Sequence, residues 1–246
     1  MKIIDAHVHV GQGVKMQLSA GQLLRQMETA NVEFAILCPM DKYMAVANRE
    51  GNEYIMREVK SHPDRFAGMA SVNPWFGRAA VEELRRALES GLTGVKIHPV
   101  FQGFRLADPI VYPLLEIAKE YDVPVYVHTG TAGIAEPFHV AELARKFPSV
   151  SFIMGHAGAS DYYNDTVRAL EFAQNLWIET SRNGPANFCH WQVHKVSDRV
   201  VFGSNAPDYK QDIEISNLMD VFQKTADREN IFENAIRKMY KGRLPI

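Results

Sequence analysis

Ile3-Ile4-Asp5-Ala6-His7-Val8-His9-Val10-Gly11, at the start of the chain, is the stretch around which we expect the molecule to be built. Successive side chains of a strand point to opposite faces, so Asp5, His7 and His9 are expected on one face and the apolar residues between them on the other. Two imidazoles then converge, and neutral imidazole is the commonest protein ligand of zinc and its neighbours. A strand that faces water can also carry two such histidines. The His-x-His pair therefore indicates a metal site only if further metal-binding side chains from elsewhere in the chain come close to it.

The composition is that of an ordinary globular protein. Of 246 residues, 46% are hydrophobic and 23% charged, and the net charge is −2. This balance gives no sign of a nucleic-acid or a membrane partner, and it is compatible with a homo-oligomer. A charge at Lys2 comes too early for a secretory leader and no apolar run reaches the length of a membrane span, so we expect a cytoplasmic protein. Cys38 and Cys189 are expected to be reduced packing residues.

Short β-branched runs alternate with segments of helical period along the whole chain. This alternation is typical of βα units and a parallel sheet. No Gly-x-Gly-x-x-Gly motif follows the first strand, which favours a closed (β/α)8 barrel over an open doubly wound sheet. We therefore predict an α/β protein with one TIM-barrel domain over residues 1–246. After the first strand, the predicted strands are 34–39, 66–72, 94–99, 123–128, 150–156, 176–181 and the start of 200–208.

Helix signals lie between these strands. Ser19 and Gln22 form a capping box for a helix that ends near Asn31, and Asp108-Pro109 supplies an N-cap followed by proline at the first helical position. Apolar residues at helical spacing predict further helices at 50–61, 80–88, 114–118, 140–147 and 166–175, with two helical stretches after the last strand.

Polar side chains gather at the ends of the predicted strands. In a β/α barrel the reacting groups sit at the C-terminal ends of the strands. Histidines end three separate strands here, each on a predicted inward face, and this coincidence predicts a metal site. The residues at these ends are His7, His9, Lys96, His98, His128, His156, Asn205 and Asp208.

Five motifs, taken in order, resemble those of the amidohydrolase superfamily. They are Asp5-Ala6-His7-Val8-His9, Gly94-Val95-Lys96-Ile97-His98-Pro99, His128-Thr129-Gly130, Gly155-His156-Ala157-Gly158 and Phe202-Gly203-Ser204-Asn205-Ala206-Pro207. The closest likeness is to the compact amidohydrolase-related branch of TIM-barrel metal-dependent hydrolases and non-oxidative decarboxylases. It extends to Asn234-Ala235, near the end of the chain.

The resemblance implies a ligand set and a cofactor. His7, His9 and His128 would bind one divalent metal, for which zinc is our first choice and manganese an alternative, and Asn205 would lie in or near the coordination sphere. His156 would be a catalytic or a second metal-site histidine. The less favoured arrangement is a binuclear site bridged by carboxylated Lys96.

Asn205 departs from the family pattern. The branch normally has aspartate in this turn, where it completes the metal site and accepts a proton from the metal-bound water. An amide oxygen can bind a metal but cannot act as a general base. Asp208, three residues on, is a candidate substitute; the alternative is a solvent-facing turn residue or N-cap.

Candidate substrate-binding residues follow strand four. Lys96 could contact an anionic substrate, or pair inside the barrel with a carboxylate such as Glu179. His98 could line the pocket, and Phe101 and Arg105 could bind a planar or acidic substrate, although such residues also serve packing. His190 and His194 have helical i, i+4 spacing but are expected to be a surface pair.

The predicted function is hydrolysis of a small amide, ester or lactone, with the metal polarising a carbonyl and activating a water. His156 would act as the acid or base or hold the developing oxyanion, and Asn205 and Asp208 are the strand-eight candidates for catalysis. A second hypothesis is non-oxidative decarboxylation of a small carboxylic acid, which needs no attacking water. A third is a metal- or metabolite-binding barrel in which catalysis is weakened by loss of the aspartate.

Overall fold

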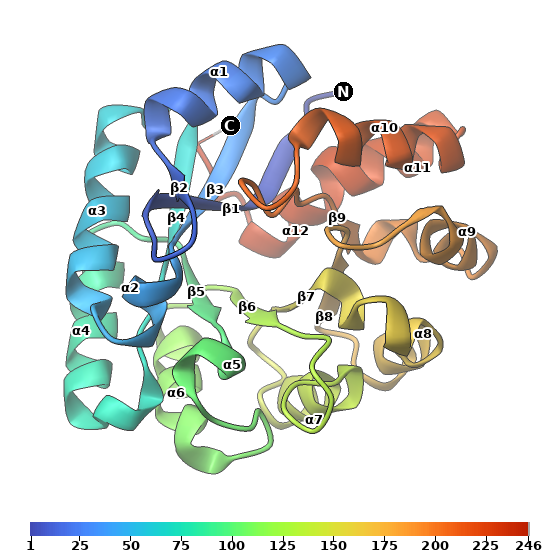
Figure 1. Cartoon of the computed structure of the whole chain (residues 1–246). Coiled ribbons are helices and arrows are strands. Elements are labelled where there is room, and N and C mark those ends of the chain that lie inside the picture. Colours follow the sequence, from blue (N-terminus) through green and yellow to red (C-terminus); the bar gives the residue numbers. More distant parts are fainter. Residues whose placement is uncertain (246) are drawn as a thin grey trace.

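The computed structural model describes residues 1–245, and its strands lie inside a ring of helices (Figure 1). The sheet has the order β2-β1-β3-β4-β5-β6-β7-β8-β9, in which β2 alone is antiparallel to its neighbour. The strands are β1 (Ile4–Gln12), β2 (Gln17–Leu18), β3 (Phe34–Pro39), β4 (Phe66–Ala70), β5 (Gly94–Ile97), β6 (Val125–His128), β7 (Phe152–Gly155), β8 (Leu176–Glu179) and β9 (Val200–Val201).

Backbone hydrogen bonds between β1 and the segment after β9 close the curled sheet. The N–H of Ala6 donates to the carbonyl of Phe202, and the N–H of His9 donates to the carbonyl of Ala206, both at 2.8 Å. Between them, the N–H of Asn205 donates to the carbonyl of His7 at 2.9 Å. The predicted barrel is therefore confirmed, and its closure places the Asn205 turn directly beside the His-x-His strand.

Helices connect successive strands and cover the outside of the barrel. They are α1 (Ala20–Ala30), α2 (Asp41–Ala45), α3 (Asn48–Ser61), α4 (Arg78–Glu89), α5 (Pro99–Gln102), α6 (Tyr112–Glu120), α7 (Pro137–Lys146), α8 (Tyr163–Phe172), α9 (Pro185–Val193), α10 (Gln211–Val221), α11 (Thr225–Glu229) and α12 (Ala235–Tyr240). Short 3-10 turns lie at Pro74–Phe76, Pro109–Val111, His156–Gly158, Ser160–Tyr162 and Ser197–Arg199, and a π turn at Asn230–Asn234 joins α11 to α12.

The capping signals in the sequence act as predicted. Ser19 caps α1 with a complete capping box, and Asn31 ends the helix in the left-handed region. Asp108 accepts a hydrogen bond from the N–H of Ile110 and starts the 3-10 turn that leads into α6. The sequence did not predict the short β2 strand or the short helices α2 and α5.

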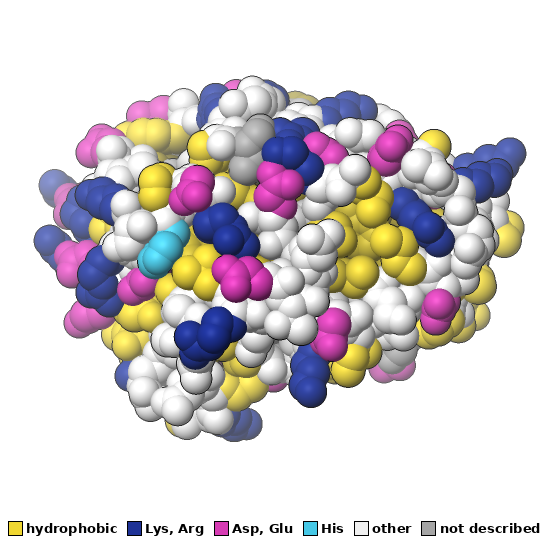
Figure 2. All heavy atoms as spheres, turned by 90° about the horizontal axis from the view of Figure 1, so that it is seen from above, with side chains coloured by type: hydrophobic (Ala, Val, Ile, Leu, Met, Phe, Trp, Pro, Cys, Tyr) yellow, Lys and Arg dark blue, Asp and Glu magenta, His cyan; other side chains and the backbone are white. Residues whose placement is uncertain are grey.

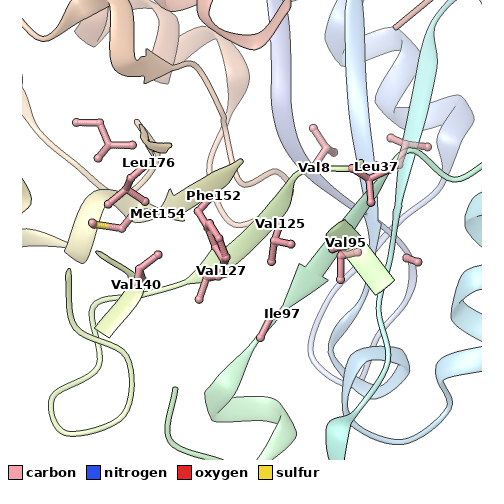
Figure 3. Packing of buried hydrophobic residues seen from close by; sticks show 14 of the residues in the cluster. Val8, Leu37, Val95, Ile97, Val125, Val127, Val140, Phe152, Met154 and Leu176 are labelled. Atoms are coloured by element: carbon pink, nitrogen blue, oxygen red, sulfur yellow. The ribbon is translucent and has the colours of Figure 1, made fainter. Parts of the chain in front are cut away.

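Two apolar cores stabilise the barrel. The larger one lies between strands and helices and includes Val8, Leu37, Val95 and Ile97 (Figure 3). The smaller one fills the barrel interior, where strand residues such as Ile4 and Phe34 pack against Ile236, Met239 and Tyr240 of α12. Because α12 supplies side chains to this inner cluster, the C-terminal segment forms part of the barrel core.

A bulge in β1 corrects the predicted alternation of this strand. Asp5 pairs with Ala35 but Val8 pairs with Leu37, so β1 carries one extra residue at this point. Asp5 therefore does not share a face with His7 and His9. Its carboxylate points outward and accepts a hydrogen bond from Gln211 Nε2 of α10 at 2.8 Å, whereas both histidines contact residues of the barrel interior.

Surface features agree with the balanced composition. Charged side chains of both signs are interspersed over the face shown in Figure 2, with hydrophobic side chains exposed between them. Within residues 1–245, α3 is the longest helix at 14 residues, and no helix is long and apolar enough to span a membrane.

The inner cluster gives a stability prediction. Ile236→Ala removes a side chain that is 1% exposed and leaves a cavity in the barrel floor, so the free energy of unfolding should fall by about 2–5 kcal/mol. Urea denaturation measures this change. Ile213→Ala on α10, where the side chain is 52% exposed, is the control and should cost less than about 0.5 kcal/mol. Equal losses of stability in the two variants would contradict a role of α12 in the barrel core.

Candidate active site

A cavity of about 250 Å³ lies at the C-terminal ends of the strands. Most of the predicted site residues line it, and they come from five different strand ends. These residues are His9, His98, Phe101, His128, His156, Asn205 and Asp208. The structure thus brings together side chains that are up to 199 positions apart in sequence, counting from His9 to Asp208 (208 − 9).

His7 and Lys96 lie beneath the cavity, and both are fully buried. Lys96 Nζ is 2.7 Å from His7 Nε2 and 3.7 Å from the centre of the Tyr126 ring. An ammonium group has no lone pair, so Lys96 donates and His7 Nε2 accepts. The predicted inward orientation of Lys96 is confirmed, but among the described residues no ion pair joins it to Glu179, because the Tyr126 hydroxyl is the group that contacts that carboxylate.

His9 is oriented by the backbone of the neighbouring strand. Its Nδ1 lies 2.8 Å from the carbonyl oxygen of Pro39, so Nδ1 carries the proton and Nε2 keeps its lone pair. Cys38 Sγ lies 3.3 Å from the same Nδ1. A carbonyl that fixes one ring nitrogen is the usual support of a metal-binding histidine.

His156 follows β7 with a backbone φ of 63°, which turns its side chain into the barrel. Its Nε2 is 2.9 Å from His128 Nδ1, and its Nδ1 is 2.7 Å from Ser181 Oγ. The two histidines therefore form one hydrogen-bonded pair at the ends of adjacent strands, in which His156 is buried and His128 half-buried.

Three rings form one wall of the cavity. Phe101 stacks on His98 with 3.9 Å between ring centres, and His98 stacks on His128 at 3.8 Å. His98 Nδ1 accepts the N–H of Phe101 and so caps the start of α5. Phe101 is 46% exposed, which leaves a flat apolar face available at the cavity mouth.

Asn205 and Asp208 lie together on the opposite side. Asn205 is 4% exposed, has a φ of 58°, and donates from Nδ2 to Asp208 Oδ2 at 3.2 Å. The Asp208 backbone N–H returns a bond to the Asn205 carbonyl at 3.0 Å. Because its amide nitrogen faces Asp208, the side-chain oxygen of Asn205 is left for other partners.

Arg105 is not brought to this cavity. It is exposed and lines a separate groove with Trp75 and Phe104. The sequence interpretation instead missed Arg182, which comes directly after the predicted strand 176–181 and lines the cavity, as does Lys15 from the loop before β2. Strand-end position could have indicated Arg182, whereas nothing in the sequence pattern placed Lys15.

Burial keeps the site imidazoles neutral. Burial, with the positive charge of Lys96 as a smaller cause, lowers the pKa of His9 to about 3. Burial, with the same charge as a smaller cause, also holds the pKa of His7 and of His128 well below the usual value. Lys96 itself has its pKa lowered by burial to about 8. Neutral imidazole is the form that binds a metal.

The sequence model of the amidohydrolase family matches residues 4–242. The chain belongs to the amidohydrolase family. A gamma-resorcylate decarboxylase from Polaromonas sp. is 26% identical over an alignment of 250 positions. The alignment covers 78% of this amidohydrolase and 76% of that protein. A 2-amino-3-carboxymuconate-6-semialdehyde decarboxylase from Dictyostelium discoideum is 33% identical over 78 residues, covering 31% of this chain and only 22% of that relative.

A solved structure shares the fold. The 5-carboxyvanillate decarboxylase of Novosphingobium aromaticivorans, complexed with manganese and 4-hydroxy-3-methoxy-5-nitrobenzoic acid, has a TM-score of 0.78 and 18% identity, over 98% of this chain and 96% of that chain.

The residues present fit a divalent metal. His7, His9 and Cys38 offer donor atoms that all lie within 4.8 Å of one another, and His7, His156 and Glu179 form a second such group. Hydrogen bonds at Nδ1 leave the Nε2 atoms of His7 and His9 as the ones that carry a lone pair. In this structure the His7 lone pair accepts a hydrogen bond from Lys96 Nζ at 2.7 Å, which a metal at His7 Nε2 would have to displace.

Metal binding yields a prediction about folding. The purified amidohydrolase should bind close to one equivalent of zinc or manganese, and His9→Ala should reduce the bound metal several-fold, as elemental analysis after dialysis would show. Chelator should lower the melting temperature yet leave a cooperative transition, because a barrel of this size has its own apolar cores. Loss of the native far-UV circular dichroism on chelation would instead make the metal a structural requirement.

Proposed function

We propose that this amidohydrolase is a metal-dependent, non-oxidative decarboxylase of a small, planar carboxylic acid. The observation that carries the proposal is Asn205, whose amide stands where a hydrolase of this family would need a base. Hydrolysis requires a group that removes a proton from the attacking water, and an amide cannot do this. Decarboxylation consumes no water at that position. The two curated relatives described above are both decarboxylases by name.

In the proposed site, His7 and His9 would hold one divalent metal, with His128, which belongs to neither of the two donor groups above, as the third imidazole and the side-chain oxygen of Asn205 beside it. Zinc and manganese both suit three imidazoles and an amide oxygen. A metal there supplies a Lewis acid that draws electron density from the substrate carboxylate and its neighbouring oxygen. A binuclear site bridged by carboxylated Lys96 fits less well, because Lys96 is fully buried and already contacts His7 and Tyr126.

Arg182 and Lys15 favour an anionic substrate. Both line the cavity, and within residues 1–245 neither has an acidic group within 4 Å to neutralise it. A guanidinium matches a carboxylate with two parallel N–H···O bonds, so Arg182 is the residue that we assign to carboxylate recognition. The exposed face of Phe101 then suits the flat remainder of the acid.

His156 is the proposed acid that completes the reaction. The bond between the carboxylate carbon and its neighbour breaks, carbon dioxide leaves, and the neighbouring carbon takes one proton in its place. His156 lines the cavity and its Nδ1–H donates to Ser181 Oγ, so Nε2 is the atom that would take a proton from solvent and deliver it, and the hydrogen bond from His128 Nδ1 to Nε2 would have to open for this step.

Hydrolysis is the second candidate, and Asp208 is the observation that favours it. Its carboxylate lines the cavity beside Asn205 and could accept the proton that Asn205 cannot. In that case the substrate would be a small amide, ester or lactone.

A substrate panel separates the two reactions. Hydroxybenzoic acids and related unsaturated acids should release carbon dioxide, and in heavy water the product should carry one deuterium at the carbon that lost it. Arg182 is exposed at the cavity, and a hydrogen bond to a charged group is worth about 1.5 kcal/mol at the lower end, so Arg182→Met should lower kcat/KM by about 10-fold. Arg168→Met on α8, where the side chain is 70% exposed, is the matched control. Turnover of esters or lactones without carbon dioxide release would overturn the proposal.

Substitutions in the strand-eight turn distinguish the candidate bases. For a decarboxylase that relies on His156, Asp208→Asn should change kcat less than about 10-fold and His156→Asn should lower it by about 100-fold or more while sparing bound metal. If Asp208 is a hydrolytic base, Asp208→Asn abolishes turnover of an ester or amide. In that case Asn205→Asp should change the rate little, or lower it by placing two carboxylates together. For a hydrolase that lacks a strand-eight base, Asn205→Asp should instead raise the rate, since a positioned base contributes typically 10²–10⁴-fold. Steady-state kinetics with parallel metal analysis measure these effects.

A further inference from the structure

Glu179, at the end of β8, is a buried carboxylate that the proposed reaction does not use. It is 0% exposed and accepts four hydrogen bonds. Two come from backbone N–H groups, those of His156 at 3.0 Å and Ser181 at 2.6 Å. The other two come from hydroxyls, Tyr126 at 2.7 Å and Ser181 at 2.9 Å, both to Oε2. Every partner is a donor, which is the arrangement of an ionised carboxylate.

One chain of hydrogen bonds, the Tyr126 arm, connects Glu179 to His7. Tyr126 has a single hydroxyl proton, and it points to Glu179, so the phenol oxygen can only accept at its second contact. That contact is His7 Nδ1 at 3.0 Å, which must therefore carry the proton. The Nε2 atom of His7 is left with a lone pair, and Lys96 donates to it at 2.7 Å. All three hydrogen bonds in this arm have the same direction.

A second chain of hydrogen bonds, the Ser181 arm, connects Glu179 to His156. The Ser181 hydroxyl proton also points to Glu179, so Ser181 Oγ accepts from His156 Nδ1 at 2.7 Å. His156 Nε2 then accepts from His128 Nδ1 at 2.9 Å. Both arms thus impose the same tautomer, with the proton on Nδ1 and a lone pair on Nε2.

Two glycines make room for this arrangement. A Cβ at Gly155 would overlap the Tyr126 ring and hydroxyl, and a Cβ at Gly203 would overlap the Glu179 carboxylate. Gly155 does not have a positive φ, so its close approach to Tyr126, and not its backbone conformation, explains the glycine there. The barrel interior is therefore shaped around Tyr126 and Glu179.

We propose that Glu179 is a positioning residue that sets the tautomers of His7 and His156 through Tyr126 and Ser181. The Tyr126 arm presents the His7 Nε2 lone pair to the metal, and the Ser181 arm presents the His156 Nε2 lone pair to the proton that is transferred. The catalytic consequence rests on the proposed function, whereas the tautomers do not. One buried carboxylate, with two hydroxyl groups, orders both halves of the site.

Histidine tautomers give a direct test. Long-range ¹H–¹⁵N spectra of the ¹⁵N-histidine-labelled full chain distinguish Nδ1–H from Nε2–H imidazole, and single His→Gln variants assign the signals. In the metal-free and the zinc-loaded protein, His156 should show the Nδ1–H pattern, and so should His7. Tyr126→Phe should change the His7 signals alone, and Ser181→Ala should change those of His156 alone. Glu179→Gln should change both.

Matched controls remove the same groups elsewhere. Tyr240→Phe deletes a buried tyrosine hydroxyl of the inner cluster that has no hydrogen-bond partner among the described residues. Ser197→Ala deletes a buried serine that donates to a carboxylate, Asp227 Oδ1, at 2.7 Å. Neither control should alter the His7 or His156 signals. Should Glu179→Gln fail to fold, Tyr126→Phe and Ser181→Ala keep the carboxylate and decide the question.

Metal affinity provides a second readout that does not depend on turnover. Tyr126→Phe should weaken zinc binding by about 10–100-fold, as loss of a ligand's hydrogen-bond partner does, while Ser181→Ala should leave it within about 3-fold. Unchanged tautomers in both Tyr126→Phe and Ser181→Ala, or identical effects of these two variants on both histidines, would overturn the inference. Correct tautomers in a protein that releases no carbon dioxide would overturn the proposed function alone.

Discussion

The structure depends on the hydrogen bonds that join β1 to residues 202–206. They close the barrel, and they also bring a turn from the end of the sequence against the His-x-His strand. Asp5 secures this contact from outside the barrel: its Oδ1 accepts the N–H of Ser204 at 2.9 Å and that of His7 at 3.1 Å. Burial raises the pKa of Asp5, and these hydrogen bonds oppose that rise. The bulge in β1 is what turns the Asp5 carboxylate to where both amides can reach it.

The same closure explains how so many polar groups can be buried in one place. An unpaired polar group in the interior costs free energy, so buried polar groups need partners. In this barrel the donors run in one direction toward Glu179, which burial would otherwise disfavour as an anion by raising its pKa. The histidines remain neutral because burial lowers each pKa, and Lys96 adds to this as a neighbouring positive charge. The site is thus prepared for a cation before one binds.

The face of the barrel to which many strand side chains point could be predicted from the sequence, because successive residues of a strand alternate between the two faces. Alternation along 94–99 placed Lys96 and His98 inside, and Val95 and Ile97 outside, as the structure shows. The alternation failed at Asp5 because one bulged residue reverses the face of a strand, and no residue type there signals a bulge. Arg105 was misplaced for a related reason: it lies in a loop, where side-chain direction has no period. Arg182 lies directly after the predicted strand 176–181, so its position was a usable signal, but its φ of 62° is a backbone conformation that the strand pattern does not predict.

Charge balance connects the amide at Asn205 to the kind of substrate that the site can take. With aspartate, a metal held as proposed would have one adjacent negative charge, whereas with Asn205 the proposed ligands would be three neutral imidazoles and a neutral amide. The carboxylates around the proposed ligands are Asp208, which accepts from Asn205 Nδ2 at 3.2 Å, Asp41, which lines the cavity, and Glu179, which is connected to His7 through Tyr126. Lys96 and Arg182 add positive charge around the same histidines. With a metal bound, the site would therefore carry one more unit of positive charge than a site with aspartate at position 205, an excess that is unfavourable at low dielectric. An anionic substrate removes that excess, whereas a neutral amide or ester does not, and this asymmetry is the physical reason to place a carboxylic acid in the cavity.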